Sequence, residues 1–274
     1  MSSQTSPPEL QTLRIEIGEG GVGTMTLNRP DSFNAMSPEM IGELTTAFSW
    51  LADLAPLRAL VLTGAGKAFS AGGDVNWFSK GVESEEIDLP SSVRRGADVL
   101  HQAIIDLRRI PYPVIAAVNG PAAGAGFSLA LACDFRVAAD SAFFAPAYGR
   151  IGASPDGGMT YFLPRVVGPS RALEILLDDP NMSAEDALAE GLVSEVVAAD
   201  ELPEAARAKA AKLAAMAPHY VRMAKYLCGV SLENGIAEHL QLERHGIADS
   251  MATEDLRNGV KAFFAGEKPE FHGN

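Results

Sequence analysis

The stretch that decides the fold runs from Pro113 to Asp140 and reads PVIAAVNGPAAGAGFSLALACDFRVAAD. Residues 113–118 form an apolar run that is too short for an amphipathic helix, so they predict a strand buried on both faces. Glycines and a proline interrupt the chain at 120–126 and permit backbone angles and close approaches that a side chain would forbid. Residues 127–133 then resume as a short apolar helix before a second apolar run.

The turn at 124–126 ends where this helix is predicted to begin. Unpaired backbone N–H groups and the positive end of the helix dipole meet at such a point. The turn is therefore a candidate oxyanion site, in which N–H groups bind an oxygen that becomes more negative during a reaction. Glycine and alanine also occur where a helix simply packs tightly on a sheet, and the local sequence leaves both interpretations open.

Composition limits the function classes. The chain has 274 residues, of which 47% are hydrophobic, so it can bury a large core as one domain or as one domain with an appendage. A net charge of −13 argues against binding to nucleic acid or to an anionic membrane. Cys133 and Cys228 provide neither a disulfide framework nor zinc-site spacing, and we therefore expect a reducing, cytoplasmic location and no metal.

The polar residues 1–10 predict a disordered leader and not a signal peptide. No apolar run approaches the roughly 20 residues that a membrane span requires.

Strands are predicted first along the chain and helices last. Residues 11–17 and 24–27 alternate around a glycine-rich turn, which predicts a hairpin. Ser37 is a helix N-cap, and the helix should run to about Leu54 with Met40, Leu44, Phe48 and Leu51 on one face. A strand at 57–62 follows, and this strand–helix–strand order predicts a parallel sheet.

The remaining elements are predicted from the same signals. Residues 77–96 have little core character and predict a mobile or partly helical flap over a site. A helix at 97–110 carries His101 and ends at Pro111. Further strands are predicted at 142–148 and 192–197, and further helices at 170–177, 183–190, 202–216, 232–250 and 253–264.

The loop TGAGKAFSAGGD at 63–74 allows three interpretations. It lacks the Ser or Thr and the leading Gly of a nucleotide phosphate loop, and its glycines are spaced wrongly for a dinucleotide fingerprint. The third interpretation is a second N–H donor site at 71–73, before a helix that begins near Asp74. A plain glycine-rich connection is the alternative.

Five strings, taken together, resemble the crotonase, or enoyl-CoA hydratase/isomerase, superfamily over nearly the whole chain. One such string would be weak, but five in order are specific as a set. The strings are LNRPDSFNAM at 27–36, GKAFSAGGDV at 66–75, IAAVNGPAAGAGFSLALACDFRVA at 115–138, RIGASPDGGMTYFLPRVVG at 150–168 and FFAGEKPEF at 263–271.

The resemblance implies an α/β, crotonase-like spiral of ββα units with a helical C-terminal trimerisation region. It implies a core with the acyl-CoA site at 11–200 and a helical region at 201–274 for oligomerisation and CoA contact, as a homotrimer or a dimer of trimers. It also implies an acyl-CoA thioester substrate, with coenzyme A as part of the substrate and no tightly bound cofactor. The thioester oxygen would receive the backbone N–H groups of Gly73 and Ala125, which is the chemistry inferred from the turn itself.

Further residues match the family positions that contact the substrate. The CoA moiety would lie along Asn28, Arg29, Ala71, Gly72 and Asp74, with Lys67, Lys268 and Phe271 as weaker candidates for the phosphate region and Gly124 in the oxyanion turn. The tail that carries Lys268 and Phe271 would reach a neighbouring subunit.

The chain departs from the family at the two glutamates with which hydratases add water. Ser128 and Tyr148 stand at those positions. A serine hydroxyl barely ionises and an unperturbed tyrosine titrates near 10, so neither shuttles protons near neutrality as a carboxylate does. Hydration of the family type is therefore not expected.

Asp156, in SPDGG, is the carboxylate that remains, and dienoyl-CoA isomerases and 4-chlorobenzoyl-CoA dehalogenases carry a catalytic aspartate at this position. An isomerase needs only one such base. Ser-Pro-Asp-Gly is also ordinary turn chemistry. His101 aligns with a dehalogenase histidine that activates water, although Tyr148 replaces the dehalogenase tryptophan, and a lone helical histidine is often a packing residue.

Three alternatives to an isomerase stay open. A hydrolytic acyl-CoA enzyme would use His101 or Asp156 on water. A non-catalytic acyl-CoA binder would keep the N–H donors without a working base. A serine hydrolase is the least supported, because Ser128 lies too far after the strand for a nucleophile elbow.

Overall fold

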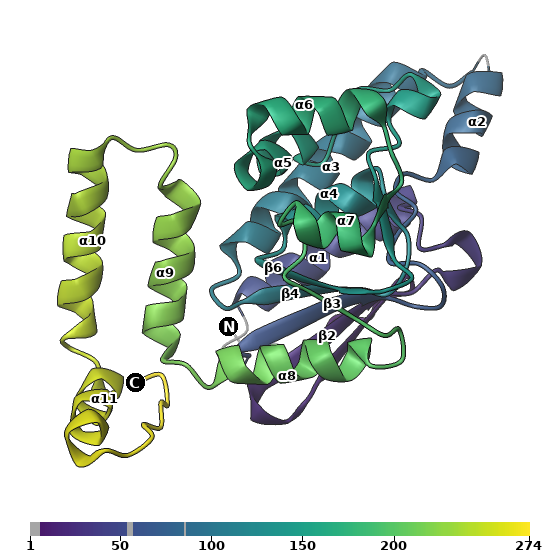
Figure 1. Cartoon of the computed structure of the whole chain (residues 1–274). Coiled ribbons are helices and arrows are strands. Elements are labelled where there is room, and N and C mark those ends of the chain that lie inside the picture. Colours follow the sequence, from purple (N-terminus) through teal and green to yellow (C-terminus); the bar gives the residue numbers. More distant parts are fainter. Residues whose placement is uncertain (1–5, 54–56, 85) are drawn as a thin grey trace.

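The structure, a computed structural model, describes residues 6–53, 57–84 and 86–274 (Figure 1). Residues 6–10 form no helix or strand, and the rest of the predicted leader lies outside the described residues. The predicted end of the first helix at Leu54 also lies outside them.

A six-stranded sheet forms the centre of the body. Its order is β1 (Leu13–Ile17), β2 (Val22–Leu27), β3 (Ala59–Gly64), β4 (Val114–Val118), β6 (Phe135–Ala139) and β9 (Glu195–Val197). β1 and β2 are antiparallel, with Leu13 opposite Leu27, and every other neighbouring pair is parallel. The predicted hairpin and parallel sheet are thus both present.

The core lies on both faces of β4, all five residues of which are buried, as expected for an apolar strand inside a parallel sheet. α8 (Leu202–Ala214) packs beneath the sheet, whereas α1 (Pro38–Asp53), α3 (Leu89–Arg109) and α4 (Ala125–Ala132) lie above it (Figure 1). The predicted face of α1 is buried, and its members are Met40, Leu44, Phe48 and Leu51.

Glu43 of α1 ties the first strand to this layer. Its carboxylate accepts hydrogen bonds from the backbone N–H groups of Gln11 (2.7 Å) and Thr12 (2.8 Å) and from the Thr12 hydroxyl (2.5 Å). Burial opposes ionisation of Glu43, but these bonds and a further one from Leu13 outweigh it and hold its pKa below the ordinary value of 4.5. The edge strand is therefore fixed by a charged group on a helix.

The predicted flap is more helical than expected. α2 (Val75–Glu83) begins at the N-cap Asp74, and α3 begins at the N-cap Asp88, eight residues before the predicted flap ends. The sequence does contain signals for the N-terminus of α3: an aspartate at the N-cap and a proline in the first turn, both of which are common where helices begin.

A second, small sheet orders β5 (Ala122–Ala123), β7 (Phe143–Ala145) and β8 (Met182–Ser183). Its strands are shorter than the one predicted at 142–148. α7 (Ala184–Ala189) packs against this sheet, and α5 (Met159–Val167) packs between α4 and α6 (Pro169–Asp178) to complete the body.

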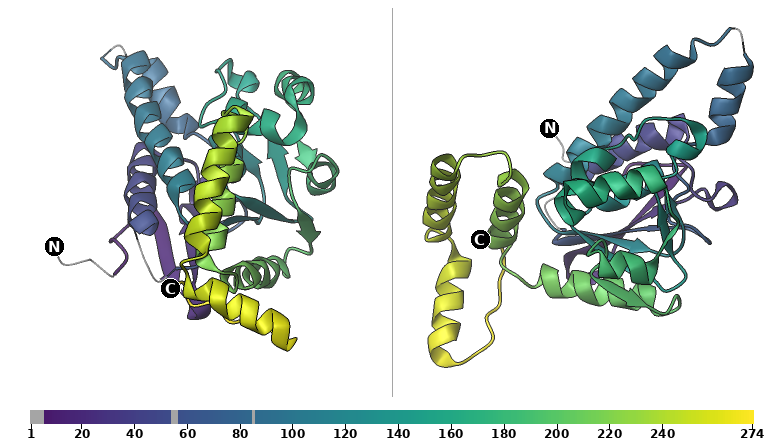
Figure 2. Two further views of the ribbon diagram at one scale, coloured as in Figure 1. Left: turned by 90° about the vertical axis from the view of Figure 1, so that its left-hand side faces the viewer. Right: turned by 45° about the horizontal axis from the view of Figure 1, so that its top comes forward.

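The last helices, α9 (Pro218–Val230), α10 (Ile236–Ser250) and α11 (Glu254–Ala265), form an arm that stands away from the body (Figures 1 and 2). α9 was not among the predicted helices. Large apolar side chains of the arm are exposed, among them Tyr220, Leu232, Ile236, Ile247, Phe263 and Phe264. Within the described residues, no helix is both long and apolar enough to span a bilayer.

Candidate active site

Two backbone segments meet where the glycine-rich loops were predicted. The loop after β3 pairs with the turn before α4: Ser70 N–H donates to the Pro121 carbonyl (3.1 Å), and Ala123 N–H donates to the Ser70 carbonyl (2.9 Å). The two loops that separately suggested N–H donor sites therefore lie side by side.

Gly72 makes this close approach possible. Its φ is +91°, and a Cβ there would stand 2.6 Å from the Ala123 oxygen and 3.2 Å from the Ala125 nitrogen. Only glycine avoids both the strained backbone and the clash. Among the described residues, the Gly73 and Ala125 N–H groups donate to no protein acceptor, so both remain available to a ligand oxygen.

Asn34 holds this loop in place, and no sequence pattern indicated this role. The side chain is fully buried and donates to the carbonyls of Ala65 (2.9 Å) and Ala68 (2.7 Å) while accepting the Arg29 N–H (2.9 Å). These bonds join segments about thirty residues apart along the chain. Only the fold reveals such a partner.

The proposed CoA contacts fall into two groups. Arg29 pairs with Asp74 (3.1 Å), the N-cap of α2, beside Gly72 and the half-buried Asn28, and Lys67 and Ala71 are exposed on the same loop. The second group, Lys268 and Phe271, lies on the tail, where Arg58 binds the Phe271 carbonyl (2.8 Å). Figure 1 places that tail beside α11, far from α2, so one chain does not bring the two groups together.

Asp156 and His101 meet, although 55 residues separate them. His101 Nε2 on α3 lies 2.5 Å from Asp156 Oδ1, and the two side chains are 49% and 37% exposed. When the carboxylate is ionised, the hydrogen of this contact is on the histidine nitrogen. The pair is thus both tightly held and open to a substrate.

Ser128 and Tyr148 contact the same aspartate, but at its backbone. The Asp156 carbonyl accepts from the Ser128 hydroxyl (2.7 Å) and from the Tyr148 hydroxyl (3.0 Å), and the two hydroxyl oxygens are 3.1 Å apart. Burial raises the pKa of Tyr148 to about 12, so its hydroxyl stays protonated at neutral pH. Neither residue is a proton shuttle in this arrangement.

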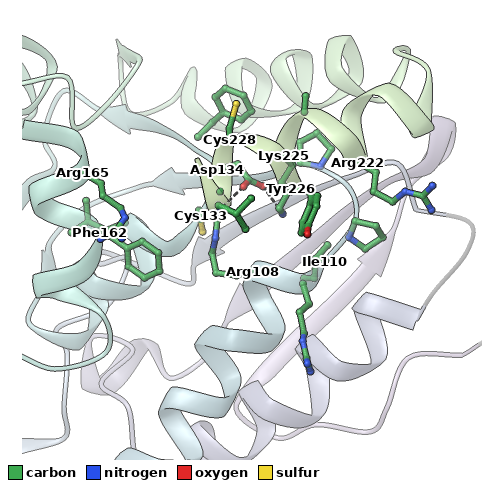
Figure 3. A pocket seen from close by; sticks show the side chains of 18 of the residues that line it. Arg108, Ile110, Cys133, Asp134, Phe162, Arg165, Arg222, Lys225, Tyr226 and Cys228 are labelled. Atoms are coloured by element: carbon green, nitrogen blue, oxygen red, sulfur yellow. Dashed lines mark hydrogen bonds and ion pairs between the residues drawn. The ribbon is translucent and has the colours of Figure 1, made fainter. Parts of the chain in front are cut away.

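A groove of about 1560 Å³ runs from the Asp156 loop to α9 (Figure 3). His101 and Gly157 line one end, the exposed faces of α3 and α5 form one wall, and α9 forms the other. Deep in it, Asp134 pairs with both Arg108 (2.8 Å) and Lys225 (2.7 Å). The side chains of Lys225 and Asp134 are only 11% and 13% exposed, and this burial lowers the pKa of Lys225.

Aromatic residues near the site have separate roles. Phe127 does not line a pocket: it is fully buried against Phe144, with ring centroids 5.4 Å apart. Tyr161 does line the groove, beneath the Arg165 guanidinium. Within the described residues, no cluster of three or more histidines, cysteines, aspartates or glutamates could hold a metal ion.

The fold and the site together define a class: an α/β protein with two backbone N–H donors that no described acceptor uses, an accessible carboxylate on another loop, and a large, mostly apolar groove. A family model described as "Enoyl-CoA hydratase/isomerase" matches residues 18–274. The chain therefore belongs to the enoyl-CoA hydratase/isomerase family, has the crotonase fold and is an enzyme that acts on acyl-CoA. The resemblance stated from the five strings is confirmed.

Among the similar proteins, some are named as hydratases and one is named as an isomerase. A "Probable enoyl-CoA hydratase" of Rhodobacter capsulatus is 39% identical over 96% of this chain and 98% of its own length. A "1,2-epoxyphenylacetyl-CoA isomerase" of Escherichia coli is 38% identical over 93% and 96%. The crystal structure of an enoyl-CoA hydratase from Bacillus anthracis matches with a TM-score of 0.89 and 33% identity, over 96% of this chain and all of that one.

Proposed function

We propose that the chain is an enoyl-CoA isomerase in which Asp156 is the single proton-transferring group. The contact pattern of Asp156 carries this proposal: its side chain is 37% exposed and contacts His101, which lines the end of the groove, while both residues at the hydratase glutamate positions bind its backbone. The isomerase name of the Escherichia coli relative agrees with it.

The proposed chemistry moves one proton. The carboxylate of Asp156 removes a proton from the α-carbon of a 3-enoyl thioester, and the electron pair forms a dienolate whose oxygen binds the Gly73 and Ala125 N–H groups. The protonated Asp156 then returns the proton two carbons along, which leaves a 2-enoyl thioester and the ionised carboxylate. Each such N–H donor typically lowers the barrier by about 2.7 to 4 kcal/mol.

The substrate would extend in two directions from this centre. The CoA moiety would lie along Arg29, Lys67 and Asp74, and the acyl group would enter the groove past His101. The reaction is redox-neutral and needs no cofactor beyond the CoA of the substrate. Lys268 and Phe271 would serve the site of a neighbouring copy in a trimer or dimer of trimers, and the cytoplasmic location and a role in fatty acid metabolism stay predictions from the sequence.

A hydrolytic acyl-CoA enzyme is the second candidate, and the 2.5 Å contact between His101 and Asp156 favours it. An imidazole oriented by a carboxylate can take a proton from water. In that case His101 would be the base and Asp156 either its orienting partner or a nucleophile.

The test compares CoA esters by mass spectrometry on the wild type and on Asp156→Asn. The esters are trans-3-hexenoyl-CoA, trans-2-hexenoyl-CoA and benzoyl-CoA, and Asp140→Asn, an exposed aspartate beyond β6, is the matched control. We expect conversion of the 3-enoyl ester to the 2-enoyl ester, reduced about 10²- to 10⁴-fold in Asp156→Asn, as for the loss of a general base.

Other outcomes distinguish the candidates. If the Asp156→Asn variant still hydrates the 2-enoyl ester efficiently, the single-aspartate mechanism is wrong. Release of free CoA that depends on His101 would favour hydrolysis. Ester binding without turnover, unchanged by the substitution, would indicate a binding protein.

A further inference from the structure

The two residues at the hydratase glutamate positions form a small buried hub with the Asp156 carbonyl. Ser128 is 0% exposed on α4, and its hydroxyl lies within hydrogen-bonding distance of the Asp156 carbonyl (2.7 Å) and the Tyr148 hydroxyl (3.1 Å). Tyr148 also donates to the same carbonyl (3.0 Å). The Met159 N–H at the start of α5 also donates to this carbonyl (3.2 Å), and the Ser128 hydroxyl lies 3.3 Å from the Gly124 carbonyl as well. The two hydroxyls therefore hold the Asp156 carbonyl together with the first turn of α5.

This hub connects the base to the oxyanion donors. Ser128 lies three residues after Ala125, so slightly less than one turn of α4, about 4.5 Å of rise, separates the Ala125 N–H from the serine. The serine hydroxyl then reaches directly to Asp156. The distance between the two groups that must act on one substrate is thus set by a single helical turn and one hydrogen bond.

The backbone after Asp156 is shaped to fit the hub. Gly157 has φ +61°, and a Cβ there would stand 3.1 Å from Ser128 Cβ. Gly158 has φ +84°. The loop therefore packs directly on Ser128, in a conformation that requires glycine, and its hydroxyl contacts determine where the carboxylate of Asp156 can lie.

We propose that Ser128 and Tyr148 are positioning residues, which hold the Asp156 loop so that its carboxylate faces the α-carbon of a thioester bound at Gly73 and Ala125. This role rests on the proposed function of Asp156 as the base. In hydratases these two positions carry glutamates that transfer protons. In this chain the residues at the same positions, Ser128 and Tyr148, instead hold the backbone of Asp156, which transfers the proton.

A positioning role predicts a specific kinetic effect, namely a change in kcat without a change in KM. Displacing a catalytic group by about 1 Å can reduce a rate 10²-fold even when the substrate still binds. Loss of either hydroxyl should therefore lower kcat and leave KM nearly unchanged. A residue with a purely structural role would instead lower stability without this separation of kcat from KM.

The experiment uses Ser128→Ala, Tyr148→Phe and the double variant in the full chain, with trans-3-hexenoyl-CoA as the probe. Two controls remove bonds of the same kind elsewhere. Tyr112→Phe deletes a buried hydroxyl that donates to the Leu51 carbonyl (2.7 Å), and Ser250→Ala deletes one that donates to the Gly246 carbonyl (2.9 Å). The measurements are kcat, KM, thermal unfolding, and deuterium uptake from D₂O at the α- and γ-carbons. This label enters when the proton on Asp156, a side chain that is 37% exposed, exchanges with solvent before it is returned.

We expect each single variant to lose about 10- to 100-fold in kcat and in deuterium uptake, with KM within about twofold of the wild type. The double variant should lose less than the product of the two single effects, because both hydroxyls bind one carbonyl. Both controls should keep the wild-type kcat.

Three results overturn the positioning role: a wild-type kcat in either folded single variant, a change confined to KM, or an equal loss in the controls. Asp156→Asn separates this failure from failure of the proposed function. If Asp156→Asn abolishes deuterium uptake but Ser128→Ala and Tyr148→Phe do not reduce it, only the positioning role is wrong. If Asp156→Asn retains uptake, or the wild type does not convert the probe, the proposed function itself is wrong.

Discussion

Asp156 has two sets of partners, one for each of its polar groups. His101 on α3 contacts the carboxylate, whereas Ser128 on α4 and Tyr148 bind the backbone carbonyl. Three separate parts of the body therefore converge on one residue. The carboxylate is still 37% exposed, which leaves room for a substrate at the end of the groove.

His101 should matter differently to the two candidate reactions. In an isomerase it orients the carboxylate, and His101→Ala should lower kcat for trans-3-hexenoyl-CoA by about tenfold, the equivalent of one hydrogen bond of about 1.4 kcal/mol. In a hydrolase it activates water, and the same variant should abolish release of CoA. Steady-state assays of both reactions make the comparison.

The control for this variant is His245→Ala, which removes an exposed histidine from α10. It should leave both rates unchanged. An isomerase rate in His101→Ala equal to that of the wild type would show that the 2.5 Å contact does not position the base.

Some features of the site could be predicted from the sequence and others could not. Motifs identify Gly73, Ala125, Asp156 and His101, and the fold brings Gly72, the neighbour of Gly73, against Ala125 and His101 against Asp156. The contacts of Ser128 could not be predicted, because they join positions 20 and 28 residues away through space. A motif identifies a residue type, but a hydrogen bond of this kind depends on packing.

At the scale of elements, the first strand depends on a carboxylate in the first helix. Glu43→Gln should lower the free energy of unfolding at neutral pH by about 1 kcal/mol, since hydrogen bonds to a charged group are worth about 1.5 to 3 kcal/mol and solvent screens this partly exposed one. The folded pKa lies below 4.5, so this contribution is present above pH 4.5 and is lost as the pH falls through the folded pKa.

Denaturant unfolding of the wild type and Glu43→Gln, at neutral pH and at several values below 4.5, tests this sign. The two curves should converge on acidification. Glu16→Gln, which removes an exposed carboxylate from β1, is the control and should leave stability unchanged. A difference that grows as the pH falls would contradict the assignment.

Elements with a strong periodic pattern were predicted from the sequence, and those without one were not. The apolar stripe predicted for α1 and the apolar run predicted for β4 are both buried in the structure. α9 has no buried residue, so no core-facing stripe marked it as a helix. The strands of the small sheet span only two or three residues, too few for an alternating pattern to appear.

For the whole molecule, the arm carries the clearest unpartnered surface. Phe263 and Phe264 on α11 are 79% and 83% exposed, which is unusual for phenylalanine. We expect these rings to be buried between copies of the chain. Phe263→Ser combined with Phe264→Ser should then weaken assembly by about 4 kcal/mol per interface, about 2 kcal/mol for each buried ring, or roughly a thousandfold in Kd.

Analytical ultracentrifugation over a range of micromolar concentrations measures this effect. The wild type should sediment as a trimer or a larger species, and the double variant should dissociate at concentrations where the wild type does not. Val82→Ser, on α2 of the body, removes an equally exposed apolar side chain and should have no effect. A wild type that sediments as a monomer would contradict the prediction.

The carboxylate of Asp134, which pairs with both Arg108 and Lys225, links the arm to the body. Lys225 belongs to α9 and Asp134 to the body, and their side chains are only 11% and 13% exposed. Removing one partner of a fully buried ion pair typically costs about 3 to 5 kcal/mol, which is an upper bound for this nearly buried one. This ion pair therefore opposes displacement of α9, which forms one wall of the groove. Glu233, just after α9, also contacts Tyr161 and Arg165 of α5, so a displacement of the arm would change the width of the space in which the acyl group would lie.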